Sequence, residues 1–386
     1  MQLFDHLLST YGTLGLATTA AILFFFIWQV AAALRFARIA GYKNNRRKKI
    51  REEGQPVSLI IPMFTEDYNF LEYRLPAIFE QDYPSMEVVI VYVGLSSDFL
   101  EDLTRLRQHY PHLIVTRVHY DPRFPISRKM ALNIGIKAAH NDCMIFSSTD
   151  VIPRSPRWIS LMAKGFTRGD IVLGYCAAEH QSGLLNGLMR MGRLLRSASW
   201  MHRATIGKPY RGTLHNFGFT RSVYFNQDEN KGFHYLGLNI GEEDLFLQQC
   251  CTSHNTSLII TPAATVEQKL WGGLRWWVSQ LCYYGAATRF YAGGVKWHFI
   301  GEQIARVAFF ATTIYGLITL PNELRYAVGG LLLLRYLILI WMFSRMTRRL
   351  GERGLLGPML IYDLIGPLWN LLLALLLLRK DKRVWR

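Results

Sequence analysis

The chain has few cysteines and none of the common cofactor-binding motifs. Its five cysteines in 386 residues show no paired spacing, so neither a disulfide framework nor a zinc finger is indicated. An odd number of cysteines without metal-ligand spacing is typical of reduced thiols facing the cytosol. No Gly-x-Gly-x-x-Gly follows the first apolar strand and no P-loop is present, which argues against a nicotinamide dehydrogenase or an ATPase.

Acidic residues are also scarce. The 44 lysines and arginines outnumber the 28 aspartates and glutamates, so the formal net charge is +16. Basic proteins bind nucleic acid, anionic lipid or phosphorylated small molecules. Here the basic clusters lie beside long apolar segments, at 43–51, 345–353 and 380–386. That placement and the lack of any nucleic-acid motif favour membrane lipids as partners and predict no nucleic acid.

Four apolar segments are candidates for crossing a membrane, which takes about 20 residues. They run from Leu14 to Leu34, from Ile304 to Leu320, from Ala327 to Phe343 and from Leu356 to Leu378. The first lacks a basic flank before it, so a cleaved signal peptide is not favoured. The sequence predicts a multi-pass membrane protein with residues 43–300 on the cytoplasmic side.

The last apolar segment has two possible arrangements. It spans once, or Gly366-Pro367 breaks it into a re-entrant or interfacial segment that returns the basic tail to the cytoplasmic side. Asp363 within it is costly in lipid, so we expect this residue to face protein or the interface.

The middle of the chain has the pattern of an α/β domain. Apolar strands alternate with amphipathic helices, which predicts a mostly parallel sheet with helices on both faces. The strands are expected at Val57–Pro62, Glu87–Val93, Leu113–Val118 and Asp142–Ser147. Glu66, Asp98 and Asp150 each follow an apolar strand. Because ligands bind at the carboxyl ends of such strands, we expect these three to cluster at one edge.

Two carboxylate motifs have the features of a metal-assisted group transfer. Asp150 ends a buried strand, and Gly241-Glu242-Glu243-Asp244 precedes an apolar helix. One carboxylate can hold a divalent cation against a phosphate, and the other can accept a proton from an attacking hydroxyl. The alternative is a turn aspartate and a helix N-cap. The histidines at 180, 202, 215 and 234 lack ligand spacing and are expected to be structural.

Several segments, taken in order over about residues 56–285, resemble the membrane-anchored family-2 glycosyltransferases of GT-A fold. The matching segments are Ser58–Pro62 with Glu66, Gln81–Pro84 with Glu87–Val91, Lys129–Ile136, Thr149–Pro153, Pro209–Gly212 with Asn216, Glu243-Asp244 and Arg275-Trp276. The resemblance implies an inverting enzyme that moves a sugar from a nucleotide-sugar donor to a lipid, lipid-linked glycan or polysaccharide acceptor.

The resemblance also implies roles for particular residues. It makes Asp244 the catalytic base and Asp150 the ligand of Mg²⁺ or Mn²⁺. Catalysis would further involve Glu243, Arg275 and Trp276, donor binding would involve Glu66, Asp98, Lys129 and Asp150, and Tyr210 and Asn216 would lie on the acceptor side. Two alternatives stay open: Arg275-Trp276 as part of an interfacial amphipathic helix, and Lys129 as a solvated helix lysine.

Three positions depart from the family pattern. Val93-Gly94 stands where the family usually has an aspartate pair, Ser148 replaces the first aspartate of Asp-x-Asp, and Gly272 replaces the glutamine of Gln-x-x-Arg-Trp. The missing glutamine and the small number of spans favour a single transfer over processive synthesis. The departures also motivate an alternative function, a non-catalytic nucleotide-sugar-binding scaffold of a polysaccharide synthesis or export complex.

These patterns divide the chain into five parts. We expect a transmembrane anchor, a basic linker, a glycosyltransferase domain, amphipathic interface helices and a C-terminal transmembrane region at residues 1–42, 43–55, 56–262, 263–300 and 301–386.

Overall fold

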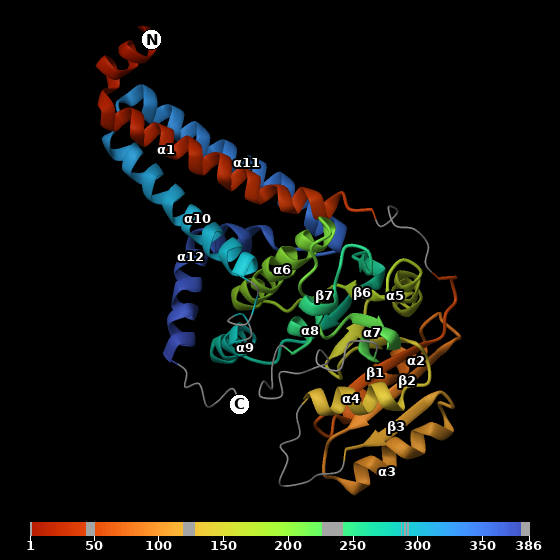
Figure 1. Ribbon diagram of the computed structural model, residues 1–386. Helices are drawn as coiled ribbons and strands as arrows, with labels where there is room; N and C mark the ends of the chain where they lie inside the picture. Colours follow the sequence, from red (N-terminus) through yellow and green to blue (C-terminus); the bar gives the residue numbers. More distant parts are fainter. Residues whose placement is uncertain are drawn as a thin grey trace.

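Strands occupy the middle of the chain, and long helices lie near both of its ends (Figure 1). The computed structural model describes residues 2–43, 51–118, 128–225, 242–286, 288, 291 and 293–379. Figure 1 places the sheets at one end of the molecule and the long helices α1 and α11 side by side at the other.

The described strands form two sheets. The larger has seven strands in the order β3-β2-β1-β4-β8-β6-β9, and the smaller has three in the order β5-β10-β7. The strands are β1 Val57–Met63, β2 Met86–Tyr92, β3 Leu113–Arg117, β4 Cys143–Phe146, β5 Val151–Pro153, β6 Ile171–Gly174, β7 Cys176–Ala178, β8 Phe217–Thr220, β9 Thr256–Ile259 and β10 Val266–Gln268.

The first four strands are parallel and carry the predicted alternation of strands and helices. In the register, β1 pairs with β2 and with β4, and β2 pairs with β3, all in parallel. Every residue of β1 is buried, as expected for a central parallel strand covered on both faces. Its side chains divide between two apolar clusters, with Ile60 in one and Leu59 and Ile61 in the other.

Shorter helices cover both faces of the sheets. Gly135 on α4 lies so close to β1 that a Cβ there would come 2.5 Å from Ile60. The helical segments of this domain are a π-helical turn Phe70–Arg74, α2 Leu75–Phe79, α3 Ser97–Arg105 with a 3-10 turn Leu106–Gln108, α4 Arg128–Ala138, α5 Trp158–Phe166, α6 Leu184–Thr205, α7 Arg221–Phe225, α8 Glu242–Cys250, a 3-10 turn Pro262–Ala264 and α9 Leu274–Ala286.

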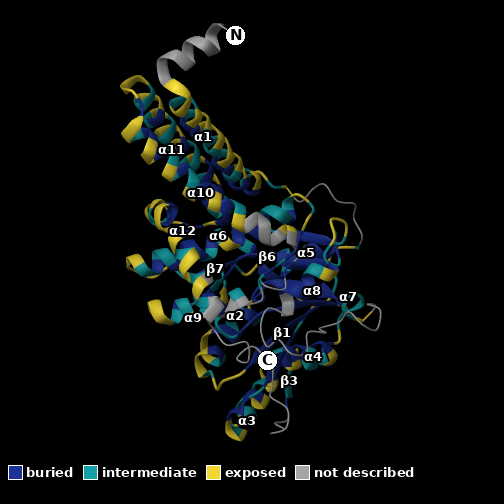
Figure 2. Ribbon diagram, turned by 60° about the vertical axis from the view of Figure 1, so that its left-hand side comes forward, coloured by how far each residue is buried: buried dark blue, intermediate teal, exposed yellow. Residues whose placement is uncertain are grey.

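Four long helices complete the molecule: α1 Gln2–Ala40, α10 Gly293–Thr319, α11 Asn322–Leu350 and α12 Leu356–Arg379. Exposed residues are frequent along α1 and α11 in Figure 2, and many of these exposed side chains are large and apolar. Within the described chain, three segments are long and apolar enough to cross a membrane: Gly12–Ala40, Asn322–Leu350 and Leu356–Leu373. Such a surface is compatible with a lipid environment.

Two expectations about the spans meet different outcomes. The predicted span at Ile304–Leu320 falls in α10 except for its last residue, and α10 is not among those three segments. The last apolar segment forms one helix, α12, with Pro367 inside it, so Gly366-Pro367 does not end the helix. The predicted α/β domain with a mostly parallel sheet is confirmed by the first four strands.

Candidate functional site

Asp150 lies in the turn between β4 and β5, beyond the carboxyl end of the parallel strands. Both oxygens of its carboxylate accept hydrogen bonds: Oδ1 from the Ser148 hydroxyl at 2.5 Å and Oδ2 from the Gln268 amide. About a third of the side chain is exposed (31%), so a ligand can reach it. Burial raises the pKa of the Asp150 carboxyl, but the nearby His215 ring, these two hydrogen bonds and Arg128 together outweigh burial and hold the pKa below its usual value.

A histidine completes the group around Asp150. The Ser148 Oγ lies 2.6 Å from Nδ1 of His215, and that nitrogen is 3.9 Å from Asp150 Oδ1. Burial lowers the pKa of His215 to about 4, so the ring is neutral at neutral pH. A hydroxyl has one proton to give, and Ser148 donates it to Asp150. Nδ1 of His215 therefore carries the proton that Ser148 accepts.

Glu66 lies at the same edge of the sheet, just beyond β1. Its Oε1 accepts a hydrogen bond from the Tyr92 hydroxyl at 2.7 Å, and this bond lowers the pKa of the exposed Glu66 carboxyl. Asp98 is exposed in the first turn of α3, which follows β2. The fold thus brings Glu66, Asp98 and Asp150 to the carboxyl ends of adjacent parallel strands.

Cationic side chains gather around the Asp150 turn. Arg74 is buried and donates to the Thr149 carbonyl at 2.9 Å. Lys269 donates its backbone N–H to the Asp150 carbonyl, and its ammonium lies 4.1 Å from the ring centre of exposed Trp271. Two more arginines, Arg128 on α4 and Arg193 on α6, contribute to lowering the pKa of His215 after burial. The turn can therefore attract an anion.

Asp244 lies in the first turn of α8, where the positive end of the helix dipole favours a carboxylate. Its side chain is 3% exposed. Oδ2 accepts a hydrogen bond from the Tyr291 hydroxyl at 2.5 Å and pairs with Arg211 Nε at 3.0 Å. The Tyr210 ring lies 6.0 Å from the Tyr291 ring and is itself buried.

One loop connects the two carboxylates. Residues 207–216 contribute Arg211, which pairs with Asp244, and His215, which contacts Ser148. Asn216 fastens the end of this loop: its amide donates to the carbonyls of Tyr175 and Ala264 and accepts from Trp158 Nε1, at 2.8–2.9 Å.

Asn216 is completely buried, so an influence on an acceptor would act through the position of this loop. A Cβ at Gly174 would come 2.6 Å from the Asn216 amide, which explains the glycine there.

The other predicted residues lie apart from these contacts. Arg275 is exposed and Trp276 half-buried in the first turn of α9, while the neighbouring Trp277 stacks on Trp369 of α12. Lys129 is buried in the first turn of α4 rather than solvated. Glu243 belongs to α8, but its side chain and Gly241 lie outside the described residues. The catalytic and binding roles of all these residues stay predictions.

The donors around Asp150 suit a divalent cation held jointly with a substrate. Among the described side chains, no three His, Cys, Asp or Glu residues form a metal-binding group. However, Mg²⁺ is commonly held by only one or two carboxylates plus substrate phosphates. Gln268 Oε1 is buried beside Asp150 and accepts no hydrogen bond from the described residues, so it offers a second oxygen. Asp150 with Gln268 therefore fits such an ion.

Sequence reasoning missed five residues of this site: Arg74, Arg211, His215, Gln268 and Tyr291. Arg211 stands within the Pro209–Gly212 segment that carried the resemblance, which was an available signal. His215 follows four residues later but was expected to be structural, because its partner Ser148 is 67 residues away in sequence. Gln268 and Tyr291 have no motif around them that would have identified them.

Comparison with known proteins gives the fold. No protein-family profile and no curated protein sequence matches the chain. A mannosyltransferase from Pyrobaculum calidifontis, solved with GDP-Man and Mn²⁺, is 15% identical and aligns over 92% of this chain and 98% of its own, with a TM-score of 0.50. S. aureus TarS with UDP-GlcNAc is 13% identical over 76% of this chain and 73% of its own, with a TM-score of 0.40. The expected GT-A glycosyltransferase fold is confirmed.

Proposed function

We propose that this protein is a membrane-bound inverting glycosyltransferase. It moves a sugar from a nucleotide-sugar donor to a lipid, lipid-linked glycan or polysaccharide acceptor. One observation carries the proposal: in a GT-A fold, a single loop, residues 207–216, contacts the surroundings of two carboxylates. Its Arg211 pairs with the buried Asp244, and its His215 contacts Ser148 beside the accessible Asp150. The Pyrobaculum mannosyltransferase supports the choice of a nucleotide-sugar donor and a divalent metal, since it was solved with both.

The donor diphosphate would lie over the Asp150 turn. A leaving nucleoside diphosphate carries at least two negative charges, and Arg74, Lys269 and Arg193 supply positive charge around the turn. Asp150 and Gln268 Oε1 would hold Mg²⁺ or Mn²⁺, which when bound neutralises diphosphate charge. The Ser148–His215 pair fixes the orientation of the Asp150 carboxylate without adding a second negative charge.

Asp244 would accept the proton of the acceptor hydroxyl as that oxygen attacks the anomeric carbon. The bond from the anomeric carbon to the diphosphate breaks as the new glycosidic bond forms, with inversion of configuration, because one base and no enzyme nucleophile take part. Arg211 and Tyr291 hold the Asp244 carboxylate in one position before attack. For this step the Tyr291 hydroxyl must leave Asp244 Oδ2, or the acceptor hydroxyl must approach Oδ1 instead.

The long helices would place this site at a membrane surface. Three segments suited to cross a bilayer adjoin the domain, and Trp277 of α9 stacks on Trp369 of α12. This arrangement supports a lipid-linked acceptor reaching Asp244 from the membrane. The basic clusters favour the cytoplasmic side for the domain.

An Asp244→Asn variant tests this proposal, because it keeps the shape of the side chain and removes its basicity. We expect turnover to fall by about 100-fold or more, with donor affinity measured by calorimetry unchanged. The control is Glu101→Gln, at an exposed carboxylate of α3 that belongs to no predicted site, and it should keep wild-type activity. Equal turnover in wild type and Asp244→Asn would show that Asp244 is not the base, whereas donor binding without turnover in both would support the non-catalytic scaffold.

A further inference from the structure

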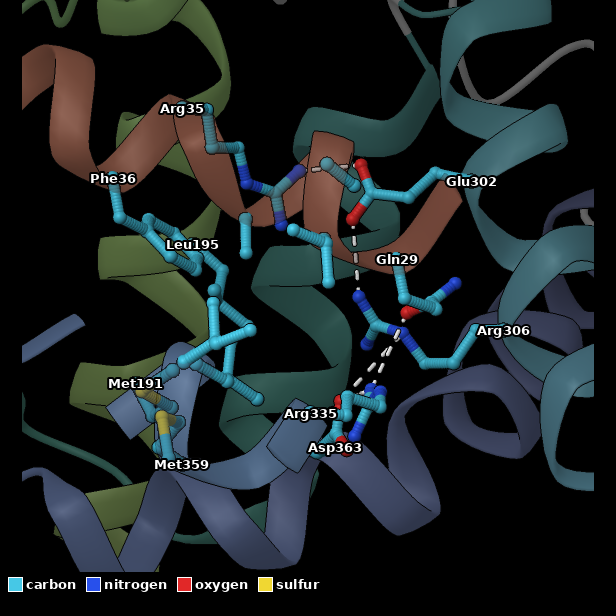
Figure 3. Close-up of a pocket in the computed structure, with 15 residues that line it drawn as sticks. Gln29, Arg35, Phe36, Met191, Leu195, Glu302, Arg306, Arg335, Met359 and Asp363 are labelled. Atoms are coloured by element: carbon cyan, nitrogen blue, oxygen red, sulfur yellow. Dashed lines mark hydrogen bonds and ion pairs between the residues drawn. The ribbon is translucent and has the colours of Figure 1, made fainter. Parts of the chain in front are cut away.

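A pocket with charged walls lies between the long helices, away from the carboxylate site. Its lining comes from α1, α10, α11 and α12 and from Met191 and Leu195 of α6. The cavity volume is about 40 Å³, room for a few water-sized groups at roughly 10–15 Å³ each. Figure 3 shows its polar side chains converging from the different helices, with methionine and leucine side chains opposite them.

The charged side chains form a chain of ion pairs. Glu302 accepts from Arg35 and, at 3.0 Å, from Arg306. Asp363 accepts two bonds from Arg335 at 2.7 and 2.9 Å and lies 3.8 Å from Arg306 Nε. Asp363 therefore faces protein, as expected from the sequence. Ionisable groups inside membrane-spanning helices are costly, and they often mark functional sites.

Positive charge is in excess in this pocket. Three guanidinium groups meet two carboxylates among the described lining residues, so one positive charge is not compensated there. Gln29 Nε2, Arg35 Nε and Arg335 Nε are also buried donors without a hydrogen-bond partner in the described part of the chain. These side chains are each at least nine-tenths buried and line the cavity. Buried donors of this kind are costly unless an acceptor meets them.

The pocket lies near the end of the helix bundle that joins the catalytic domain. Arg35 is little more than about one turn from the end of α1 at Ala40, and Asp363 is about two turns from the start of α12 at Leu356. Gln29 lies about three turns from the same end of α1, so the pocket extends from near headgroup depth at Arg35 deeper into the bundle. The remaining lining is apolar, including Phe36, Ile338 and Leu339.

We propose that this pocket binds the phosphate of an anionic phospholipid, with Gln29 and Arg35 as donors to the headgroup. The inference rests on the membrane placement proposed above but not on glycosyl transfer. Helix α6 runs from this pocket, at Met191 and Leu195, to Arg203, whose guanidinium lies 5.7 Å from the Tyr210 ring. A bound lipid would therefore restrict the motion of α6, the helix that packs beside the Asp244 site.

The test is a thermal-unfolding titration of the purified full-length protein in a non-ionic detergent. The probes are phosphatidylglycerol, phosphatidylcholine with the same acyl chains, and inorganic phosphate, all without donor. We expect phosphatidylglycerol alone to raise the Tm saturably. Native mass spectrometry should detect one retained phosphatidylglycerol. Equal stabilisation by phosphatidylcholine would overturn the proposal, and equal stabilisation by inorganic phosphate would overturn the assignment to a lipid.

Three variants and a control locate the site. Gln29→Leu keeps every ion pair, and Arg35→Gln removes one cation; each should weaken the affinity for phosphatidylglycerol about tenfold. Glu302→Gln removes a negative charge and should strengthen it, the opposite of a purely structural effect. Arg38→Gln removes an exposed cation of the same helix and should bind as wild type does. Should Arg35→Gln fail to fold, Gln29→Leu decides, and wild-type affinity in it would overturn the proposal.

Discussion

At the scale of single residues, a serine and a neutral histidine support the Asp150 carboxylate. Ser148 donates to Asp150 and accepts from His215, so the pair orients the carboxylate. We expect Ser148→Ala to lower kcat/KM about 10–100-fold and to weaken activation by Mn²⁺, because supporting bonds of this kind position a metal ligand.

A steady-state assay over a range of Mn²⁺ concentrations measures this effect. Ser160→Ala is the matched control, since Ser160 bonds only within its own turn through the Arg157 carbonyl. His215→Asn keeps an N–H near the position of Nδ1 and should lose less activity than His215→Leu. Full activity in Ser148→Ala would show that Asp150 needs no such support.

Glu87 gives the clearest pH dependence of stability. Burial raises the pKa of this carboxyl, but bonds from the Ser58 hydroxyl and from His140 outweigh burial and lower it below 4.5. A carboxyl whose pKa is lower in the folded state stabilises the protein at pH values above its unfolded-state pKa. This stabilisation is lost as the pH falls through the folded-state pKa.

Wild type should therefore unfold at a higher Tm than Glu87→Gln near pH 6, and the difference should shrink at pH values below about 4.5. Thermal unfolding of both proteins across this range measures the difference. A difference in Tm that stays constant across this range would contradict the assigned pKa shift.

At the scale of elements, the loop of residues 207–216 depends on the Asn216 anchor. Asn216→Ala would leave the Ala264 carbonyl and the Trp158 Nε1–H without the bonds that the amide makes, and the Tyr175 carbonyl would keep only its bond from the Val266 N–H. We expect the free energy of unfolding to fall by at least about 2 kcal/mol, and activity to fall with it, in denaturant titrations and turnover assays. Asn69→Ala, at an exposed position whose side chain makes no capping bond, is the control and should change neither.

The elements differ in how far the sequence predicts them. Strands β1, β2, β3 and β4 were predicted to within about two residues at each end, because each contains an uninterrupted apolar run. The second half of the sheets was not predicted, since β5, β7 and β10 have three residues each and carry no period.

The same difference holds for the site. Asp150 and Asp244 stand at ends of regular elements, where a carboxylate can be recognised from its neighbours in sequence. Tyr291 lies 47 residues from Asp244, and Gln268 lies 118 from Asp150. Contacts at such separations follow from packing and leave no local pattern. The span expected at Ile304–Leu320 rested on its apolar run alone, and α10 is not among the three described helices that are long and apolar enough to cross a membrane.

At the scale of the whole molecule, Glu352 connects the α/β domain to the helix bundle. This buried residue follows α11 and accepts hydrogen bonds from Tyr175 at 2.8 Å and from Arg190 at 2.8 Å, and it lies 3.7 Å from Arg154. Glu352→Ala would leave buried cations without their partner, which typically costs about 3–5 kcal/mol.

We therefore expect Glu352→Ala to lower the Tm by several degrees and to speed limited proteolysis between the domain and the bundle. The control is Glu323→Ala, at an exposed glutamate near the other end of α11. Unfolding and proteolysis at wild-type rates in Glu352→Ala would mean that apolar packing of α6 against α12 is enough to hold the two parts together.

The most direct test of the proposed function is diphosphate release by the purified protein in nanodiscs. A panel of nucleotide sugars is supplied with Mg²⁺ or Mn²⁺, with and without a total lipid extract. The account predicts release with one donor that depends on metal and acceptor and is lost in Asp150→Ala and Asp244→Asn. Donor binding without release under every condition, equal in wild type and both variants, would contradict it.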